Sequence, residues 1–412
     1  MAIYLALLVI LGLVSWVTYL RPAQVKLDKK INQLNKNTIK SYNMIIVVGI
    51  TLLLIIISSC RDISVGYDTR NYYEYFTFKE IYPAHRSFEF LYELINYIAV
   101  KLNFPFNMVL LMCATITFGS LGFVVYKFSD HPAMVYFFFV ALGFFGNTFN
   151  AVRQYLALAV FLFSLKHIKN GNFIKYVIYV VVAYFFHSSA IILLPIYFLR
   201  NLKLTPKFII VVLVLMLVGS VLLVPAVRII STITNFDYYQ RYIASGDFVQ
   251  GISLFNVAYA LGMIAVFALF YMLKPLVERK YSDVRNYNIF LLLFFICVAI
   301  RTFGTLCGMF SIINRLNIYF FFAIAFLMPY LFDCLPTVWL KLMLLFTFLL
   351  GAVYNYISGA VRGTNGVFPY KLIWGTQIVP SIIFYASIVL ISVLIILLGY
   401  RIRHFNKFGE NK

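Results

Sequence analysis

Long apolar stretches separated by short polar segments recur along the whole chain. A helix needs about 20 apolar residues to cross the hydrocarbon core of a bilayer, and fewer when side chains at its ends snorkel. The pattern predicts about 13 membrane-spanning helices, at residues 2–20, 42–59, 106–126, 132–149, 154–166, 174–186, 188–200, 208–230, 252–273, 286–306, 315–333, 338–356 and 379–400. We therefore expect an all-α polytopic integral membrane protein, with residues 1–412 forming a single transmembrane domain.

Two segments allow more than one interpretation. Residues 174–200 form one apolar run with an interruption at His187. We expect two short helices that meet there, with one long tilted helix as the alternative. Residues 88–104 carry Glu89 and Glu93 at i, i+4, which favours an amphipathic helix on the membrane surface over a spanning one. Three longer outer loops are expected, the first of which includes this interfacial helix: residues 60–104, 231–251 and 357–378.

The composition supports the membrane assignment. Hydrophobic residues make up 63% of the chain and charged residues 12%, about half of the charged share of a soluble domain. This balance excludes a soluble enzyme, a nucleic-acid-binding protein and a secreted disulfide scaffold. The five cysteines show no CxxC spacing, so neither a metal site nor a disulfide framework is expected. The N-terminal sequence has no basic stretch and no small-residue cleavage site, which predicts a retained first helix.

The net charge of +20 is distributed between the apolar runs rather than on a polar domain. If residues 88–104 do not span the membrane, 22 of the 34 Lys and Arg residues fall on one side, which the positive-inside rule assigns to the cytoplasm. The remaining 12 comprise nine arginines and three lysines, whereas the cytoplasmic set has 16 lysines and six arginines. Arginine binds phosphate through paired donors and keeps its charge. The outer face therefore has the composition of an anion-binding surface.

The first outer loop and the interruption at His187 supply candidate reactive groups. Asp68 and Arg70 lie close to Tyr72 in the sequence. A carboxylate beside an arginine stays ionised, so Asp68 could accept a proton from a sugar hydroxyl, while tyrosines could stack on sugar rings. A solvated loop with an Asx turn is the alternative. His187 could act as a base or donate to a bridging oxygen, although a hydrogen-bonded interior histidine is the plainer interpretation.

Arginines at the ends of predicted spans are candidate phosphate ligands. Arg153 and Gln154 precede an apolar helix and could form a polar pocket for a diphosphate; snorkelling to lipid headgroups is the alternative. Arg301 ends one predicted span and Arg315 opens the next, so both should reach one outer pocket. Tyr319 follows Arg315 by about one helical turn, which places both on the same helix face.

Arg241 lies in a further polar and aromatic cluster in an outer loop. The chain contains no Walker loop, dinucleotide-binding glycine pattern, HExxH motif or DxD pair. A substrate would therefore have to bring its own activation. A sugar carried on a lipid diphosphate does so, because the diphosphate is the leaving group.

Short motifs occur in a fixed order over residues 60–370: Gly66-Tyr67-Asp68-Thr69 with Asn71-Tyr72, Glu89-Phe90 with Tyr92, Arg153-Gln154, Phe186-His187-Ser188-Ser189-Ala190 with Leu194-Pro195, Arg315 with Tyr319-Phe320, and Pro369-Tyr370. Together they resemble the EpsG-type branch of the Wzy-like polysaccharide polymerases. Tyr67 departs from the pattern, in which a small residue stands between the glycine and the aspartate.

The resemblance implies a GT-C-like fold with an active site at the outer face of the bacterial cytoplasmic (inner) membrane. The implied enzyme is a metal-independent glycosyltransferase without cofactors, which joins oligosaccharide repeat units carried on undecaprenyl diphosphate into an O-antigen or exopolysaccharide. The growing chain leaves its lipid and is transferred to the non-reducing end of the incoming repeat. The implied partners are these lipid-linked substrates, the bilayer, a chain-length regulator and a flippase, and no nucleic acid.

On this hypothesis Arg153, Arg301 and Arg315 hold the diphosphate. Asp68, ranked slightly above His187, takes the proton from the acceptor hydroxyl. The rest of the predicted substrate-binding set is Gln154, Tyr319, Arg70, Tyr72, Arg241 and Tyr370. A flippase or transporter for lipid-linked oligosaccharides and an O-antigen-ligase-like transferase are the alternatives. A flippase should place its arginines near the bilayer midplane, whereas these gather at predicted helix ends.

Overall fold

The computed structural model describes residues 2–19, 29–78, 88–234, 252–362 and 366–375, together with positions 381, 384, 385, 388, 389 and 391. The predicted site residue Arg241 lies outside these residues, as does most of the predicted span 379–400. The described part is helical, and its β-type pairing is limited to an isolated antiparallel bridge between Arg61 and Leu372. The predicted all-α class is confirmed for this part of the chain.

Seven helical segments of the described chain are long and apolar enough to cross a membrane. They are α1 (Ala2–Tyr19), α2 (Lys29–Ser59, apolar over Ile39–Ser59), α5 (Phe106–Phe128), α12 (Leu254–Lys280), α13 (Arg285–Cys307), the segment Arg315–Cys334 from α14 (Phe310–Phe321) and α15 (Ala323–Cys334), and α16 (Val338–Arg362). They coincide with seven of the predicted spans and agree with a polytopic membrane protein. The number 13 stays a prediction.

Other predicted spans correspond to shorter or more polar elements: α6 (Pro132–Ala141), α7 (Phe144–Asn147), α8 (Val152–Asn170), α9 (Phe173–Phe186) and the 3₁₀ helix η1 (Ser188–Leu199). The predicted span 208–230 corresponds to α10 (Pro206–Thr234), an apolar helix of 29 residues. The predicted span 132–149 is interrupted, because Gly143 adopts a φ of +84° between α6 and α7. The apolar run 174–200 divides into two helices at His187, as predicted, and the alternative of one long helix is wrong.

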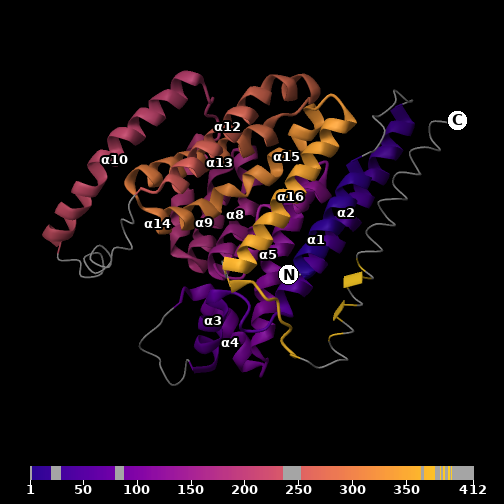
Figure 1. Ribbon diagram of the computed structural model, residues 1–412, viewed down its shortest axis with the longest axis vertical. Helices are drawn as coiled ribbons and strands as arrows, with labels where there is room; N and C mark the ends of the chain where they lie inside the picture. The colour runs from indigo at the N-terminus through magenta and orange to yellow at the C-terminus, as the bar shows by residue number, and fades with distance from the viewer. Residues whose placement is uncertain are drawn as a thin grey trace. The chain divides into compact units, whose positions relative to one another are not determined.

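The chain divides into two compact units, and the first comprises residues 1–165, 174–190 and 335–412. Within it α2 packs against α5 and α6, and α1 packs against α6 and α16. Helices α1, α2, α5 and α16 are labelled in Figure 1. A Cβ atom at Gly122 of α5 would lie 2.6 Å from Thr51 Oγ1 of α2, so glycine permits the close approach of these helices. The hydroxyls of Thr51 and Tyr136 are hydrogen-bonded at 2.6 Å, which joins α2 to α6.

The first unit also contains α3 (Tyr67–Phe78) and α4 (Phe90–Lys101), which are drawn together in Figure 1. α3 is a helix that lies within the predicted outer loop 60–104. Its buried side chains Thr69, Tyr72 and Tyr75 recur every three residues, a helical spacing that the polar composition obscures. α4 has 12 residues and is about 18 Å long, too short to cross a bilayer core of about 30 Å.

Backbone hydrogen bonds tie the segment before α3 to residues 366–375. Asp62 N–H donates to Lys371 O at 2.9 Å, and Gly66 N–H donates to Gly366 O at 2.7 Å. These bonds fix the start of α3, and Gly66 has a φ of +96°, a conformation that side chains of L-residues rarely adopt.

We expect Gly66→Ala to destabilise the protein by about 1–3 kcal/mol, because the added Cβ would lie 2.8 Å from Thr69 Oγ1 in a strained backbone conformation. Thermal unfolding of the purified protein in detergent measures the effect. Gly119→Ala in α5 is the matched control, since its Cβ would meet no atom within 4 Å. An equal melting temperature for Gly66→Ala and the wild type would contradict the strained backbone conformation and close packing described at Gly66.

The second unit comprises residues 166–173 and 191–334. Its central helix is α13, which packs against α10, α12, α14 and α15 (Figure 1). α13 is apolar on all sides and largely buried, as expected for a helix surrounded by others. It ends at Gly308, whose φ of +70° provides a left-handed C-cap. α10 instead exposes large apolar side chains such as Leu215, which suits a surface that faces lipid.

Candidate active site

The carboxylate of Glu89, immediately before α4, is the centre of a polar cluster in the first unit. Glu89 Oε2 is paired with Arg153 Nη1, and Oε1 lies 2.8 Å from His187 Nδ1. The backbone N–H of Ser188 also donates to Oε1, at 3.2 Å. Arg153 and His187 are 64 and 98 positions away from Glu89 in the sequence, so residues that are distant along the chain meet at one carboxylate.

All three side chains of this cluster lie at helix ends. Glu89 is the last residue before α4, Arg153 is the second residue of α8, and His187 separates α9 from η1. The backbone N–H of His187 still donates to Ala183 O at 3.0 Å, so the histidine closes the last turn of α9. Polar side chains at the ends of apolar helices remain close to the polar boundary of a bilayer. The fold thereby brings the three ionisable groups together at helix ends rather than within a helix.

The pKa of Glu89 is lowered to about 2. Burial by itself would raise this pKa, but the hydrogen bond from His187 and the positive charge of Arg153 outweigh it. An ionised carboxylate only accepts hydrogen bonds, so His187 Nδ1 must be the donor in this pair. In the neutral imidazole ring the lone pair is then on Nε2, which makes Nε2 the atom able to take a proton.

A second carboxylate supports the cluster from α4. Glu93 Oε1 accepts a hydrogen bond from Tyr75 OH at 2.7 Å and from the backbone N–H of Phe88 at 3.1 Å. The Phe88 ring in turn lies beneath the Arg153 guanidinium, 4.2 Å from ring centroid to Cζ. Burial and the bond to Glu93 raise the pKa of Tyr75, so its hydroxyl remains a donor. Residues 88–104 were predicted to form an amphipathic helix on the membrane surface, but the carboxylates of Glu89 and Glu93 both bond to other residues of the first unit.

Tyr72 and Gln154 flank Arg153. Tyr72 is 5% exposed and its hydroxyl donates to Asn150 O at 3.3 Å. Burial raises the pKa of Tyr72, and a hydrogen bond with Arg153 partly offsets this effect. Gln154 is buried beside Arg153. Tyr72 therefore has the contacts of a residue that positions Arg153.

Asp68 and Arg70 both belong to α3. Asp68 lies half-buried in its first turn, and its charge contributes to the raised pKa of Tyr72. Arg70 is exposed and pairs with Glu74 at 3.1 Å, as an i, i+4 pair on the helix surface. The Asx turn considered for this region occurs at Asp62, whose Oδ1 accepts from its neighbour Ser64.

The remaining predicted ligands are distributed over both units. In the second unit Arg301 is 6% exposed, donates to Asn256 Oδ1 at 3.0 Å and lies over the ring of Tyr259. Arg315 is exposed there, whereas Tyr319, one turn further along α14, is fully buried. In the first unit the Tyr370 hydroxyl donates to Ile57 O at 2.7 Å.

Neither Glu89 nor Arg61 is assigned a functional role on the sequence alone. Glu89 appeared only in the family resemblance and in the amphipathic pattern of residues 88–104. Arg61 is 2% exposed, donates to Ser58 Oγ at 3.1 Å and lies 4.5 Å from the Phe149 ring centroid. Burial lowers the pKa of Arg61 to about 10. Nothing in the local sequence distinguishes this buried arginine from Arg70, which is exposed.

Among the described residues, no group of three or more His, Cys, Asp or Glu side chains is arranged to hold a metal ion. The chemistry that the cluster supports is proton transfer at His187 Nε2, assisted by a carboxylate that remains ionised. Such a His–carboxylate pair orients the ring and stabilises the imidazolium that forms.

Comparison with known proteins identifies the family. A family model described as the EpsG family matches residues 44–372, a region that contains Glu89, Arg153 and His187. No curated protein and no solved structure matches the chain. Because the family model covers well over half of the sequence, the chain belongs to the EpsG family.

Proposed function

We propose that the protein is a polysaccharide polymerase that joins oligosaccharide repeat units carried on undecaprenyl diphosphate at the outer face of the cytoplasmic membrane. Membership of the EpsG family supports a polymerase-type role. The observation that carries the chemical proposal is the pairing of His187 with Glu89. A GT-C-like fold of about 13 spans and independence of metal ions belong to the same proposal, and the distribution of Lys and Arg supports its topology, with the N-terminus outside and the C-terminus inside.

In the proposed reaction His187 Nε2 takes the proton from a hydroxyl at the non-reducing end of the incoming repeat. The hydroxyl oxygen forms a bond to the anomeric carbon of the growing chain. The bond between that carbon and the diphosphate oxygen breaks, and the lipid diphosphate leaves with the electron pair. The negative charge of Glu89 stabilises the imidazolium. We now rank His187 above Asp68 as the base, because the histidine has a carboxylate partner that fixes its donor and acceptor atoms.

The structure also changes the role that we propose for Arg153. Its guanidinium is paired with Glu89 and stacked on Phe88, so its first task is to hold the carboxylate in place and ionised. Arginine has five N–H donors, and those not used by Glu89 and Tyr72 remain suited to a phosphate oxygen. Arg315 is an exposed residue of the second unit, and its role as a phosphate ligand stays a prediction.

We expect Arg153→Ala to lower the rate of polymerisation about 100-fold or more, because Glu89 loses its cationic partner and His187 loses its orientation. In cells, single lipid-linked repeats should accumulate on the outer leaflet. Lys101→Ala is the matched control, since it removes an exposed basic side chain at the end of α4 in the same unit. Wild-type chain length in Arg153→Ala would contradict this role.

Reconstitution of the purified protein with undecaprenyl-diphosphate-linked repeats tests the proposed function. A polymerase should convert single repeats into a ladder of longer products on a gel. Movement of repeats across the bilayer without a ladder would instead identify a flippase. Transfer of one repeat to a different acceptor, again without a ladder, would identify a ligase-type enzyme.

A further inference from the structure

Arg61 carries a buried charge in the first unit that the proposed reaction does not use. Its side chain is 2% exposed, and no acidic side chain among the described residues forms an ion pair with it. Burying a charge without a counterion is costly. Burial lowers the pKa of Arg61 to about 10, which still leaves the guanidinium charged at neutral pH. Its contacts indicate which part of the fold this charge serves.

The Arg61 guanidinium is anchored at the end of α2. Its Nη1 donates to the carbonyl oxygen of Ser58 and, at 3.1 Å, to Ser58 Oγ. Ser58 belongs to the last turn of α2, where a positive charge is favourable beside the helix carbonyls that lack an intrahelical partner. The backbone next to Arg61 is fixed as well, because Ile373 N–H donates to Cys60 O at 3.0 Å. Both the chain and the side chain of Arg61 are therefore held in place.

The same guanidinium contacts the turn that precedes α8. Its Cζ lies 4.5 Å from the ring centroid of Phe149, a fully buried residue. The next residue, Asn150, accepts a hydrogen bond from Tyr72 OH through its backbone carbonyl, at 3.3 Å. Arg153 follows three residues later, in the first turn of α8. The place of Arg153 thus depends on a turn that both Arg61 and α3 contact.

A layer of aromatic rings also connects the two arginines. Tyr92 of α4 is 1% exposed, and it interacts electrostatically with both Arg61 and Arg153. The Tyr92 ring lies 5.3 Å from that of Tyr72 and 5.5 Å from that of Phe88, between ring centroids. Phe88 in turn lies beneath the Arg153 guanidinium. Arg61 is therefore linked to Arg153 both through the turn before α8 and through these rings.

We propose that Arg61 is a positioning residue, which holds Arg153 against Glu89 by way of the turn before α8. This inference rests on the proposed function only for its effect on the reaction, since the positioning is a property of the folded protein. Arg61 does not touch the reacting atoms. It acts on Arg153, which keeps Glu89 in place and ionised, and Glu89 orients His187. Removal of Arg61 should therefore weaken the whole cluster.

The acid sensitivity of the purified protein tests this positioning without requiring turnover. The titratable groups of the cluster and its support come from α3, α4, α8 and the end of α9: Tyr72, Tyr75, Glu93, Arg153 and His187. In Arg61→Met the guanidinium of Arg153 should move away from Glu89, and the pKa of Glu89 should rise from about 2 toward its ordinary value of 4.5. The ionised carboxylate then stabilises the folded state less, so less stability is lost on acidification.

The quantity to measure is the part of the fall in melting temperature between pH 4.5 and 2 that depends on Glu89. It is the difference between each protein and the same protein carrying Glu89→Gln. We expect Arg61→Met to lose at least half of this difference. A difference equal to that of the wild type would overturn the proposal.

Phe149→Leu provides a second variant, which removes the ring beneath Arg61 and leaves every charge in place. It tests the same contact if Arg61→Met does not fold. We expect the part of the acid sensitivity that depends on Glu89 to decrease in this variant too. A folded Phe149→Leu protein with the full wild-type difference would contradict the route through the turn before α8.

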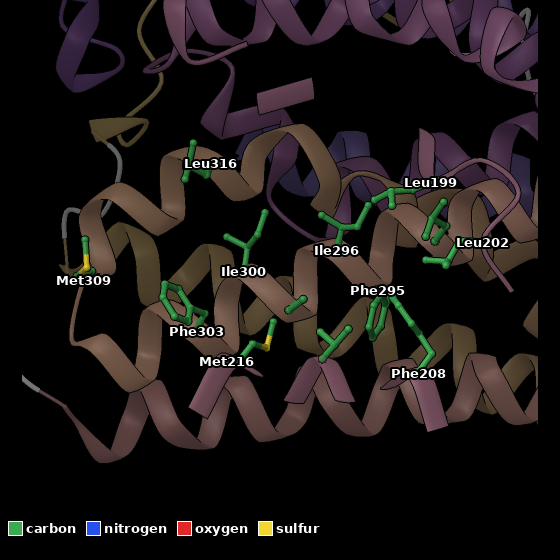
Figure 2. A pocket seen from close by; sticks show the side chains of 13 residues that line it. Leu199, Leu202, Phe208, Met216, Phe295, Ile296, Ile300, Phe303, Met309 and Leu316 are labelled. Atoms are coloured by element: carbon green, nitrogen blue, oxygen red, sulfur yellow. The ribbon is translucent and has the colours of Figure 1, made fainter. Parts of the chain in front are cut away.

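A control in the second unit identifies a purely structural loss. That unit contains an apolar groove of about 520 Å³, lined by Phe295 together with Phe208 and Met216 among others (Figure 2). Phe295→Leu should lower the melting temperature because it removes buried apolar atoms. It should leave the part that depends on Glu89 unchanged. If Phe295→Leu reduced this part as much as Arg61→Met does, the effect of Arg61 would be one of general stability, and the proposal would be wrong.

The rate of ladder formation tests whether Arg61 acts through Arg153. We expect Arg61→Met to lower kcat about 10–100-fold, with KM for the lipid-linked repeat little changed because Arg61 is buried. In an Arg153→Ala background the same substitution should have little further effect, since the residue through which it acts is gone. A general loss of folded protein would instead lower the rate equally in both backgrounds. Equal effects in both backgrounds would overturn the proposed role.

The two proposals fail in different ways. If Arg61→Met loses the acid sensitivity that depends on Glu89 but the reconstituted wild type forms no ladder, the positioning role stands and the polymerase function does not. If the ladder forms but this acid sensitivity is unchanged in Arg61→Met, the polymerase function stands and the positioning role does not.

Discussion

Replacing Glu89 with glutamine should abolish detectable polymer while leaving the protein folded in the membrane. Glutamine has nearly the same size but no charge, so neither Arg153 nor His187 keeps its ionic partner. Its amide can also donate to His187 Nδ1, which would move the ring proton to Nε2 and remove the acceptor. Loss of general-base catalysis of this kind costs about 10²–10⁴-fold in rate. Initial rates of ladder formation by the reconstituted variant measure the effect.

Glu74→Gln is the control for this variant, because it makes the same chemical change in a partly exposed glutamate of the same unit. Its rate should stay within a few-fold of wild type. Full activity of Glu89→Gln would show that the charge at this position is not required.

The lowered pKa of Glu89 sets the pH dependence of its contribution. The group titrates at 4.5 without its partners and at about 2 in the folded protein. When the pKa of a carboxyl group is lower in the folded than in the unfolded protein, its ionised form stabilises the folded state. This stabilisation is complete at pH values above the pKa of the unfolded protein, and it is lost as the pH falls toward the pKa of the folded protein. We expect the melting temperature of the wild type to fall more steeply between pH 4.5 and 2 than that of Glu89→Gln. A loss of activity at higher pH must then come from another group.

The second large effect is expected for His187→Gln. The glutamine amide can still donate to Glu89 Oε1, so the cluster should keep its contacts, but no basic nitrogen replaces Nε2. We expect the rate of polymerisation to fall by about 10²–10⁴-fold. His187→Ala should recover part of its activity when imidazole is added, because the free base can occupy the vacated space. Ladder formation in the reconstituted system measures both effects.

His131→Gln is the matched control, since His131 packs against Tyr19 rather than near Glu89. Its rate should match the wild type. If His187→Gln keeps full activity, the histidine is not the base, and Asp68→Asn becomes the variant to examine.

The membrane spans could be predicted from the sequence because hydrophobicity is a local property. A run of about 20 apolar residues needs no partner to be recognised. The division of residues 174–200 was predictable for the same reason, since His187 interrupts the run. The break at Gly143 was not predicted, because one glycine within apolar residues does not reveal a left-handed conformation.

The candidate site could be predicted only in part. Arg153 and His187 were recognised individually, since ionisable groups near apolar runs are rare. Glu89 was assigned to the membrane surface, because an i, i+4 pair of carboxylates suits either a hydrated face or an inward one. Only the packing of α4 against α5 and its neighbours decides between them. The pairing of Glu89 with a residue 98 positions away depends on tertiary structure, which no local pattern contains.

The most direct test of the account is a double-mutant cycle on the reconstituted enzyme, with Glu89→Gln, His187→Gln and the double variant. Residues that act as one catalytic unit have strongly non-additive effects. If Glu89 acts through His187, the rate of the double variant should be close to that of His187→Gln alone. A double variant whose rate is reduced by the product of the two single effects would show that the residues act independently, and would contradict a His–carboxylate pair as the centre of the reaction.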